Sequence, residues 1–360
     1  MTAPLISGVR AAIWDGTKLI VDEVSLLPPS AGEVTVRVLA SGICHSDLNV
    51  IDGRAPLPAP VVLGHEAAGV VERIGADVDS VAVGDEVMIS SMTPCGACPS
   101  CRADRPSRCR AAYGRPSFPF RWRGSHVRSY ANVSSFATHV TVRAAQLFST
   151  TGIPPASGAL IGCAVSTGWG AVTNVAQVAA GEIVVVIGIG GIGVNAIAAA
   201  RAAGAARIVA VDIDPRKERI ARHFGADEFV TDISTIAGAD STADVMAGIR
   251  ADVVIECSGA PAAISAASDL APTVALVGIP PADYELSVNA RSLVLGRRLL
   301  GSLNGDIVPA RDVPAIVDLA RSGALDLAAQ VTGVWSLDRI EDAIAAIRSG
   351  DVVRATLDMR

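Results

Sequence analysis

The order of hydrophobic and polar residues divides the chain into two kinds of segment. Between residues 33 and 90, short apolar runs such as VTVRVLA, AAGVVERIG and GDEVMIS are separated by Gly, Pro and Asp, which predicts an irregular, mostly β region. From residue 182 onward, apolar runs of strand length alternate with segments of helical composition; the runs are EIVVVI, ARIVAVD, ADVVIEC and TVALVGI. This alternation predicts a doubly wound parallel sheet, so we expect an α/β protein with an additional β-rich domain.

The segment from Arg115 to Tyr130 shows little periodicity and is rich in Arg, Gly, Pro, Ser and aromatic residues. This composition predicts a long surface loop in which Arg121, Arg123 and Arg128 are solvated. The alternative is that the loop covers a substrate pocket, where these three arginines would favour an anionic substrate.

Composition limits the partners that the protein is expected to bind. The chain has 360 residues, which suffice for two domains with sizeable cores, and half of them are hydrophobic. A net charge of −6 argues against nucleic acid or an anionic membrane as the main partner, so a small molecule is expected. No apolar run reaches the roughly 18 residues of a membrane-spanning helix. The N-terminal stretch MTAPLISGVRAAIWDG lacks the features of a signal peptide, so we expect a cytoplasmic, reducing location.

A glycine motif follows the first of the apolar runs. Gly188, Gly190 and Gly193 lie between the predicted strand and a predicted helix, and Asp212 ends the next strand. In this context the glycines permit a tight turn, the approach of a pyrophosphate and close packing of the helix on the strand. Asp212 would accept hydrogen bonds from ribose hydroxyls and repel a 2′-phosphate, which favours NAD over NADP. The alternative is a simple turn followed by a solvated aspartate.

Four of the seven cysteines lie in the stretch CGACPSCRADRPSRC, as Cys95, Cys98, Cys101 and Cys109. In a reducing compartment, clustered thiols are more often metal ligands than disulfides. Four thiolates leave no open position on a zinc ion, so the predicted site is structural and stabilises a lobe at about residues 90–112. An iron–sulfur cluster or a redox pair is the alternative.

Three other motifs contain the residue types of a catalytic zinc site. GICHSD contains Cys44, LGHE contains His65 and Glu66, and IGCAVSTG contains Cys163. One imidazole and two thiolates leave one zinc position open for a substrate. Each motif is ambiguous by itself, because an isolated cysteine is more often a buried core thiol, as we predict for Cys257 in VVIECSG.

Together these motifs resemble those of the zinc-dependent medium-chain alcohol dehydrogenases. The resemblance covers essentially the whole chain and is carried by motifs in the family's order: GICHSD, LGHEAAGVVERIG, VGDEV, the four-cysteine stretch, GCAVSTGWGAV, VVVIGIGGIGVNAI, VDIDPRK, VGIPP and RSGDVVRATL. It points to the long-loop branch, which includes thiol-dependent formaldehyde dehydrogenases and nicotinoproteins. It implies a GroES-like catalytic domain at residues 1–164 and 304–360 and a Rossmann NAD-binding domain at residues 165–303.

The resemblance also implies a role for individual residues. Cys44, His65 and Cys163 would bind the catalytic zinc, Asp47 would orient His65, and Ser46 would be the first proton acceptor. Glu66 would lie behind the metal and enter its coordination transiently. The implied cofactor contacts are His45, Thr167, Gly188, Gly190, Gly191, Ile192, Gly193, Asp212, Lys217, Ile279 and Arg354. The implied substrate pocket consists of Ser46, Met92, Phe136 and Ile279. Asn49 replaces a histidine that completes the proton relay in much of the family, which leaves the route beyond Ser46 open.

The activity implied is reversible hydride transfer between a primary or secondary alcohol and NAD, with alkoxide and aldehyde bound to zinc. Two Zn²⁺ ions per chain are expected, one catalytic and one structural. A homodimer or homotetramer is expected to form through the segment RSLVLGRRLLGSLNG. The alternatives are a nicotinoprotein that does not release NAD(H), a thiol-dependent formaldehyde dehydrogenase, and a non-catalytic NADH- or zinc-binding protein. The identity of the alcohol does not follow from these motifs.

Overall fold

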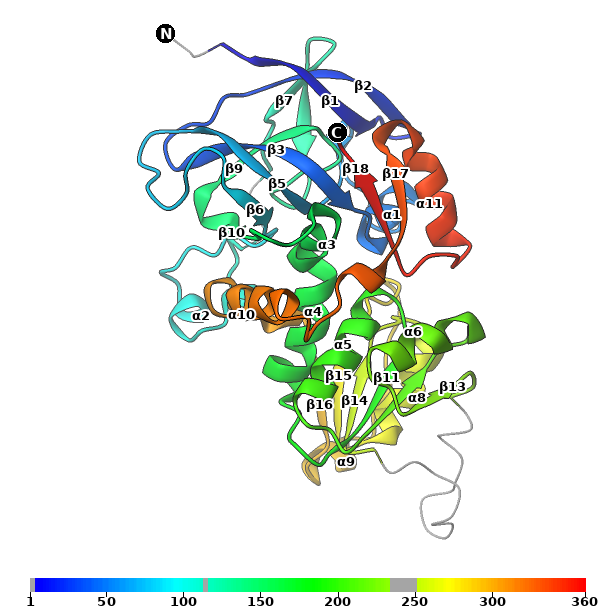
Figure 1. The fold of residues 1–360 in the computed structure, drawn as a ribbon. Helices are drawn as coiled ribbons and strands as arrows, with labels where there is room; N and C mark the ends of the chain where they lie inside the picture. Colours follow the sequence, from blue (N-terminus) through cyan, green and yellow to red (C-terminus); the bar gives the residue numbers. More distant parts are fainter. Residues whose placement is uncertain (1–3, 113–115, 234–250) are drawn as a thin grey trace. The chain divides into compact units, whose positions relative to one another are not determined.

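The computed structural model describes residues 4–112, 116–233 and 251–360 (Figure 1). The chain divides into two compact units. The first unit contains the chain up to Cys163 together with Val308–Arg360, and the second unit contains Ala164–Ile307. The predicted combination of a β-rich unit with a parallel α/β unit is confirmed.

Two sheets form the first unit. One closes into a barrel, in the order β1 (Ile6–Trp14), β2 (Leu19–Leu26), β7 (Phe120–Trp122), β8 (Ser125–Ser129) and β4 (Val61–Val62). The other runs β10 (Leu147–Ser149), β6 (Glu86–Ile89), β5 (Glu66–Ile74), β3 (Glu33–Gly42), β18 (Arg354–Asp358) and β17 (Val331–Ser336), with β9 (His139–Arg143) also paired to β3. Buried aliphatic side chains from both sheets form one core.

The predicted surface loop at residues 115–130 is wrong over most of its length. Strands β7 and β8 pair as an antiparallel hairpin and complete the barrel. Arg123 and Gly124, between the strands, have φ values of 49° and 80°, which is the geometry of a tight hairpin turn. Arg121 donates to the carbonyl groups of Phe118 and Phe120, and Arg123 pairs with Asp22, so both arginines stabilise the hairpin. Arg115 lies outside the described residues.

A long helical stretch, Pro155–Ala176, consists of α3 (Pro155–Leu160), the π-helical turn η3 (Ile161–Val165), α4 (Ser166–Gly170) and the π-helical turn η4 (Ala171–Ala176). Its length and apolar composition would suit a membrane-spanning helix, but most of it is buried inside the protein. In the first unit, Ala159 of α3 packs against Ala40 of β3 and Ala68 of β5. These small side chains let the helix approach the sheet closely.

The second unit contains a parallel sheet in the order β13 (Glu228–Val230), β12 (Arg207–Val211), β11 (Ile183–Ile187), β14 (Val253–Glu256), β15 (Thr273–Leu276) and β16 (Arg298–Gly301). Its longer helices are α5 (Gly191–Ala202), α6 (Glu218–His223), α8 (Pro261–Leu270) and α9 (Ala290–Val294). The strand order reverses between β11 and β14. Ligands of doubly wound sheets bind at such a switch point, beyond the carboxyl ends of the strands.

The remaining helices are short or lie near the C-terminus. In the first unit they are α1 (His45–Ile51), α2 (Pro99–Arg102), α10 (Pro309–Arg321), α11 (Ile340–Arg348) and the single turns η1 (Pro106–Arg108), η2 (Ala144–Gln146), η7 (Ala328–Gln330) and η8 (Leu337–Arg339). In the second unit they are the single turns η5 (Pro215–Lys217) and η6 (Asn304–Asp306).

Candidate metal centre and cofactor site

The first unit brings together four side chains that are far apart in the sequence. One donor atom from each of Cys44, His65, Glu66 and Cys163 lies within 4.8 Å of the others. Cys44 precedes α1, His65 directly precedes β5, Glu66 is the first residue of β5, and Cys163 lies in the π-helical turn η3. The structure therefore places the three predicted zinc ligands close enough to share one ion.

Close backbone packing holds these donors in place. A Cβ atom on Gly162 would lie 2.8 Å from the carbonyl oxygen of Ile89, so glycine lets the turn that carries Cys163 approach β6. A Cβ atom on Gly42 would lie 2.0 Å from Oε2 of Glu66. π-Helical turns inside α-helices occur frequently at functional sites, because they redirect side chains.

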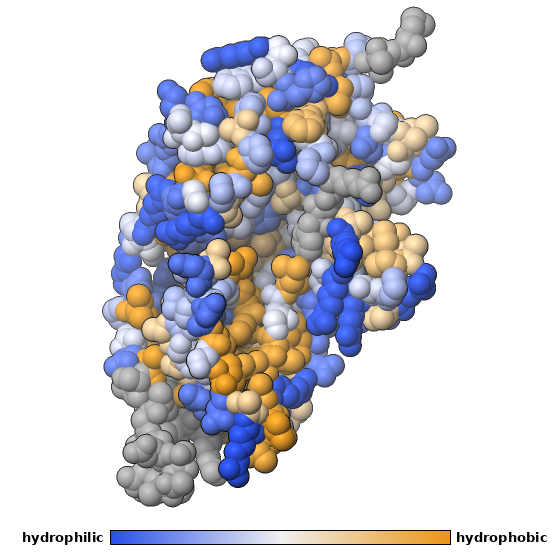
Figure 2. Space-filling view, turned by 180° about the vertical axis from the view of Figure 1, so that it is seen from behind, coloured by the Kyte–Doolittle hydropathy of each residue, from blue (hydrophilic) through white to orange (hydrophobic). Residues whose placement is uncertain are grey.

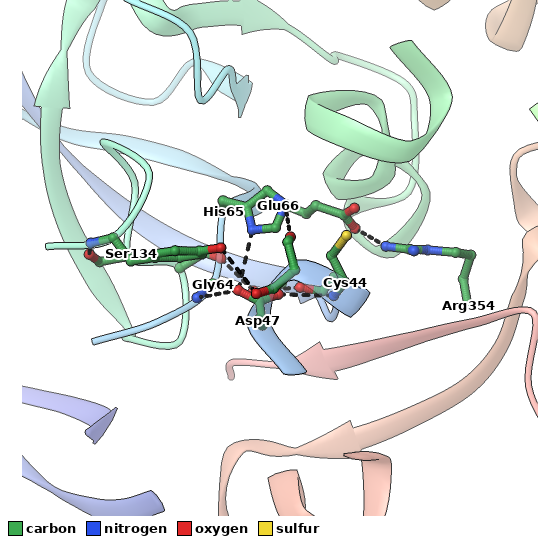
Figure 3. Close-up of polar contacts among 12 residues, drawn as sticks. Cys44, Asp47, Gly64, His65, Glu66, Ser134 and Arg354 are labelled. Atoms are coloured by element: carbon green, nitrogen blue, oxygen red, sulfur yellow. Dashed lines mark hydrogen bonds and ion pairs between the residues drawn. The ribbon is translucent and has the colours of Figure 1, made fainter. Parts of the chain in front are cut away.

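Asp47 connects three parts of the site and has no exposed surface (Figure 3). Its Oδ1 atom accepts the backbone N–H of Gly64 at 3.0 Å and lies 3.3 Å from Nδ1 of His65. Its Oδ2 atom accepts the backbone N–H of Cys44 at 2.9 Å. Hydrogen bonding to Nδ1 leaves Nε2 of His65 available to a metal, as expected for a ligating imidazole.

Glu66 and Arg354 form a buried ion pair beside the cluster (Figure 3). Burial raises the pKa of the Glu66 carboxyl to about 7, although the positive charge of Arg354 acts in the opposite direction. The Oε1 atom of Glu66 is buried and has no hydrogen-bond partner within the described residues. Arg354, implied as a pyrophosphate contact, is therefore engaged with Glu66 in this structure, and its cofactor role stays a prediction.

The two thiols of the cluster also perturb each other. A hydrogen bond from Cys163 lowers the pKa of the Cys44 thiol, and the same interaction raises the pKa of Cys163. Burial opposes protonation of His65, but the charges and hydrogen bonds of Asp47 and Cys44 outweigh it and raise its pKa. Two sulfurs, an imidazole nitrogen and an unpaired carboxylate oxygen fit a zinc ion.

Ser46 and Tyr130 lie against this cluster. The Ser46 hydroxyl is 3.4 Å from Nε2 of His65, which suits its predicted role. The Tyr130 ring meets the His65 ring edge-on at 5.7 Å, and its hydroxyl donates to the carbonyl oxygen of Ser46 at 3.3 Å. Tyr130 was missed in the sequence, where its aromatic character was the available signal.

Met92 and Phe136, two of the residues expected in the substrate pocket, are buried. Phe136 has no exposed surface and belongs to the hydrophobic core of the first unit, next to Gly64. Met92 is 1% exposed. Tyr130 contacts the His65 ring, and the pocket roles of Met92 and Phe136 stay predictions.

The other cysteine cluster lies in the predicted lobe. One sulfur atom each from Cys95, Cys98, Cys101 and Cys109 lies within 4.8 Å of the others. The sulfurs of Cys98 and Cys101 are 3.5 Å apart, and all seven cysteines, each of them in a described region, are free thiols. Backbone N–H groups, first that of Cys95, lower the pKa of Cys109 to about 6. Four sulfurs without another donor fit a structural zinc ion.

The glycine motif of the second unit forms the turn between β11 and α5. A Cβ atom on Gly193 would lie 2.0 Å from the carbonyl oxygen of Gly188, whereas one on Gly190 would meet nothing within 4 Å. The Asp212 carboxylate, just beyond β12, accepts the backbone N–H of Ile189 at 2.6 Å. Gly188, Gly190 and Asp212 thus lie where a dinucleotide binds a doubly wound sheet, with exposed Gly190 open to a pyrophosphate.

Several implied cofactor contacts lie near this turn. Gly191 and Ile192 begin α5, and the carbonyl oxygen of Ile192 would lie 2.3 Å from a Cβ atom on Gly168, next to Thr167. Lys217 ends η5 beyond Asp212, and Ile279 follows β15 with 73% of its surface exposed. His45, the first residue of α1, is an exposed residue of the first unit.

Two residues at the carboxyl edge of the sheet, Cys257 and Ile213, are more exposed than their sequence context suggests. Cys257, which we predicted to be a buried core thiol, directly follows β14 and keeps part of its surface exposed, although burial raises the pKa of its thiol. Ile213 follows Asp212 and is 91% exposed. Ile213 was missed in the sequence, where its place directly after the acidic strand end was the available signal.

Known proteins match this chain over nearly its whole length. Residues 30–154 match the alcohol dehydrogenase GroES-like domain, and residues 191–322 match the zinc-binding dehydrogenase domain. The chain is 34% identical to an S-(hydroxymethyl)glutathione dehydrogenase of Escherichia coli, over 98% of this chain and 99% of that protein. An alcohol dehydrogenase zinc-binding domain protein from Burkholderia ambifaria superimposes with a TM-score of 0.90, at 30% identity over 99% and 100% of the chains. Benzyl alcohol dehydrogenase from Acinetobacter calcoaceticus gives 0.88, at 28% identity over 98% and 99%.

Proposed function

Because the chain belongs to the zinc-dependent alcohol dehydrogenase family, we propose that it catalyses reversible hydride transfer between a primary or secondary alcohol and NAD. The observation that carries this proposal is the cluster of Cys44, His65, Glu66 and Cys163 in the first unit, with His65 oriented by Asp47. Two thiols and one imidazole are the ligand set of a zinc ion that keeps one position for substrate.

Cys44, His65 and Cys163 would hold the catalytic zinc, with Glu66 beside them. Zinc supplies a Lewis acid that lowers the pKa of an alcohol hydroxyl, as it does that of water. The Ser46 hydroxyl, 3.4 Å from Nε2 of His65, would accept the proton that the alcohol loses. Tyr130 holds the backbone of Ser46 by a hydrogen bond and limits the space beside His65.

The second unit would bind the nicotinamide cofactor at the turn of Gly188, Gly190 and Gly193. Asp212 supports NAD rather than NADP, because its carboxylate accepts ribose hydroxyls and repels a phosphate at the same place. Ile213 would pack against the adenine base. NAD accepts the hydride, and the chain supplies the binding and orientation of the dinucleotide.

Cys95, Cys98, Cys101 and Cys109 would bind a second, structural zinc, which gives two ions per chain. The four sulfur atoms leave no place for a substrate. The short turns α2 and η1 of this lobe have few buried apolar side chains, so the metal would supply much of the stability of the lobe.

We also propose that the chain forms a homo-oligomer through the second unit. Strand β16 lies at one edge of the parallel sheet, and α9 beside it exposes Val294 and Leu295 by 85% and 75%. Figure 2 shows hydrophobic side chains gathering over this unit. An unpaired edge strand next to exposed apolar side chains is typical of an interface. Size-exclusion chromatography with light scattering measures the assembly, and Val294→Asp should dissociate it.

A second candidate activity is the oxidation of S-(hydroxymethyl)glutathione. The similarity to the Escherichia coli dehydrogenase of that name favours it. Its substrate is itself an alcohol, so both activities would use the same zinc ligands. The two are separated by testing formaldehyde oxidation with and without glutathione.

The test is a panel of alcohols and aldehydes, assayed with NAD, with NADP and with neither, on protein of measured zinc content. The proposal expects NAD-dependent turnover and its loss in Cys163→Ala. Absorbance of nicotinamide in desalted protein, at about one per chain, would instead support a nicotinoprotein. Turnover that survives in Cys163→Ala contradicts the proposed metal site, and Cys257→Ala is the matched control that should keep full activity.

A further inference from the structure

A cavity of about 400 Å³ lies in the first unit, outside the candidate metal centre. Its walls come from the loop after β2, the start of β3, both ends of the β7–β8 hairpin, the segment after this hairpin, and β9. Among the described residues, the lining includes no candidate metal ligand and neither Ser46 nor Tyr130. Binding sites for small molecules have volumes of about 300–1,000 Å³ and combine an apolar surface with a few polar groups, so this cavity has the size of such a site.

The apolar part of the lining is partly open to solvent. Leu27 and Phe118 keep 36% and 41% of their surface exposed. Phe120 and Val133, which also line the cavity, are buried. Exposed apolar side chains that gather in a hollow indicate a surface for an apolar group of a ligand.

Hydrogen bonds connect the walls of the cavity to one another. The backbone N–H of Leu27 donates to the carbonyl oxygen of Pro119 at 2.8 Å, and that of Ser129 donates to Ser117 at 2.8 Å. The Thr141 hydroxyl donates to the carbonyl oxygen of Leu27 at 2.9 Å. The cavity is therefore formed before a ligand binds, and binding requires little ordering of the protein.

Glu33 is the one charged side chain in the lining that the structure describes; the other polar residues there are serines, a threonine and an asparagine. Its Oε2 atom accepts the backbone N–H of Ser30 at 3.1 Å and also the Ser30 hydroxyl. Its Oε1 atom makes no hydrogen bond to the described residues and is left for a ligand. Arg128 lies over the Phe118 ring, 5.4 Å from the ring centroid, but does not belong to the lining. The lining thus offers a carboxylate beside an apolar surface, which favours a positively charged group.

We infer that this cavity is a binding site for small organic cations that carry one amidinium or ammonium group on an aromatic body. The cationic group binds the Glu33 carboxylate, and the aromatic body packs against Leu27 and Phe118. Glu33 disfavours an anion such as a nucleotide phosphate, so the site is not a second site for the cofactor. The inference goes beyond the proposed function and does not depend on it.

The test titrates the full chain with three molecules of nearly the same shape, followed by ligand-observed NMR. They are benzamidine, which is a cation, benzamide, which is neutral, and benzoate, which is an anion. Wild type should bind benzamidine with a Kd of about 0.1–1 mM, benzamide about tenfold more weakly and benzoate more weakly still.

Two substitutions separate the charge from the apolar surface. Glu33→Gln keeps an acceptor for Ser30 and should weaken benzamidine about tenfold, whereas benzamide should stay within about twofold. Phe118→Ala removes an exposed side chain and should weaken benzamidine and benzamide alike, by about fivefold. Glu23→Gln is the matched control, because Glu23 is an exposed residue of the same unit that accepts the backbone N–H of Gly8 and does not line the cavity. It should leave all three affinities unchanged.

Three results would overturn the inference. The first is benzamidine affinity within about twofold of wild type in both Glu33→Gln and Phe118→Ala, which would mean that benzamidine binds elsewhere. The second is an equal loss of benzamidine and benzamide affinity in Glu33→Gln, because recognition would then not depend on charge. The third is tighter binding of benzoate than of benzamidine to wild type, which would make Arg128 the determining charge. If Glu33→Gln does not fold, Phe118→Ala and the order of the three affinities in wild type decide.

Discussion

Asp47 offers the sharpest test of the candidate metal centre, because one buried carboxylate joins three parts of it. Oδ1 accepts from Gly64 and faces His65, and Oδ2 accepts from the backbone of Cys44. In Asp47→Asn, the amide oxygen should take the place of Oδ1, because this arrangement keeps two of the three hydrogen bonds. The amide nitrogen then faces the N–H group of Cys44, donor against donor.

The magnitude follows from the bond that is lost. A hydrogen bond to a charged group contributes about 1.5–3 kcal/mol, and the two bonds that remain lose the assistance of the negative charge. A loss of about 2 kcal/mol in the support of Cys44 and His65 corresponds to about 30-fold weaker zinc binding. This lies within the range of about 10–100-fold for removal of a group that orients a metal ligand.

Zinc affinity is measured by competition with a chromophoric chelator on metal-depleted protein. The four-cysteine cluster serves as an internal control, since its affinity should not change in Asp47→Asn. Asp338→Asn is a matched control, because Asp338 pairs with Arg10 on the surface of the same unit, with 59% of its side chain exposed. Exposed pairs contribute about 0–1 kcal/mol, and this one touches no candidate ligand. The reasoning is refuted if Asp47→Asn binds zinc as tightly as wild type at both sites.

Three further predictions concern other parts of the chain. Gly190→Ala should fold normally and bind NAD weakly, whereas Gly193→Ala should also lose stability, because its Cβ atom would lie 2.0 Å from a backbone oxygen; thermal unfolding and calorimetric titration separate the two. Cys98→Ser should lower the zinc content by about one ion per chain and destabilise the lobe, and equal metal content in Cys98→Ser and Cys257→Ser would contradict this. Burial lowers the pKa of His139 below its unfolded value of about 6.5, so the folded state binds fewer protons and loses stability as the pH falls below about 6.5. His139→Gln should remove this part of the pH dependence in denaturant unfolding curves followed between pH 7 and 5.

The parallel sheet was the part of the fold that sequence patterns predicted best. Its strands are buried on both faces, so each appears as an uninterrupted apolar run, and the runs of β11, β12, β14 and β15 lie where predicted. The hairpin of β7 and β8 was missed, because these strands are short, each carries an arginine, and β8 has a serine at each end. The Arg-Gly pair between them is only a weak signal for a turn. The hairpin is stabilised by the pairing of its strands with the rest of the barrel, which the local sequence does not show.

The metal-binding residues were predicted from motif order and residue type, but their convergence depends on long-range packing. Cys163 approaches Cys44 because Gly162 and Ala159 let the helical stretch lie close to β3, β5 and β6. No local pattern in the sequence contains that contact. The pairing of Glu66 with Arg354 likewise joins residues 288 positions apart, through β5, β3 and β18.

The contact of Tyr130 with His65 depends on the backbone between Tyr130 and Phe136. Alternation of side chains holds only where the chain is extended, and the stretch between these two aromatic residues is not. Ala131, Asn132 and Ser134 have φ values of 48°, 60° and 61°, so the chain changes direction at these residues. Side chains in this stretch therefore do not alternate between two faces as they do in an extended strand. Left-handed backbone at an alanine and a serine has no sequence signature, since neither residue type favours it. The hydrogen bonds of the Tyr130 N–H to Ser134 and of the Asn132 amide to the carbonyl oxygen of Ser91 maintain this conformation. The side chain that contacts His65 is therefore determined by a tertiary contact with the segment that precedes the cysteine lobe, and a change at Asn132 is expected to displace Tyr130 before it affects any zinc ligand.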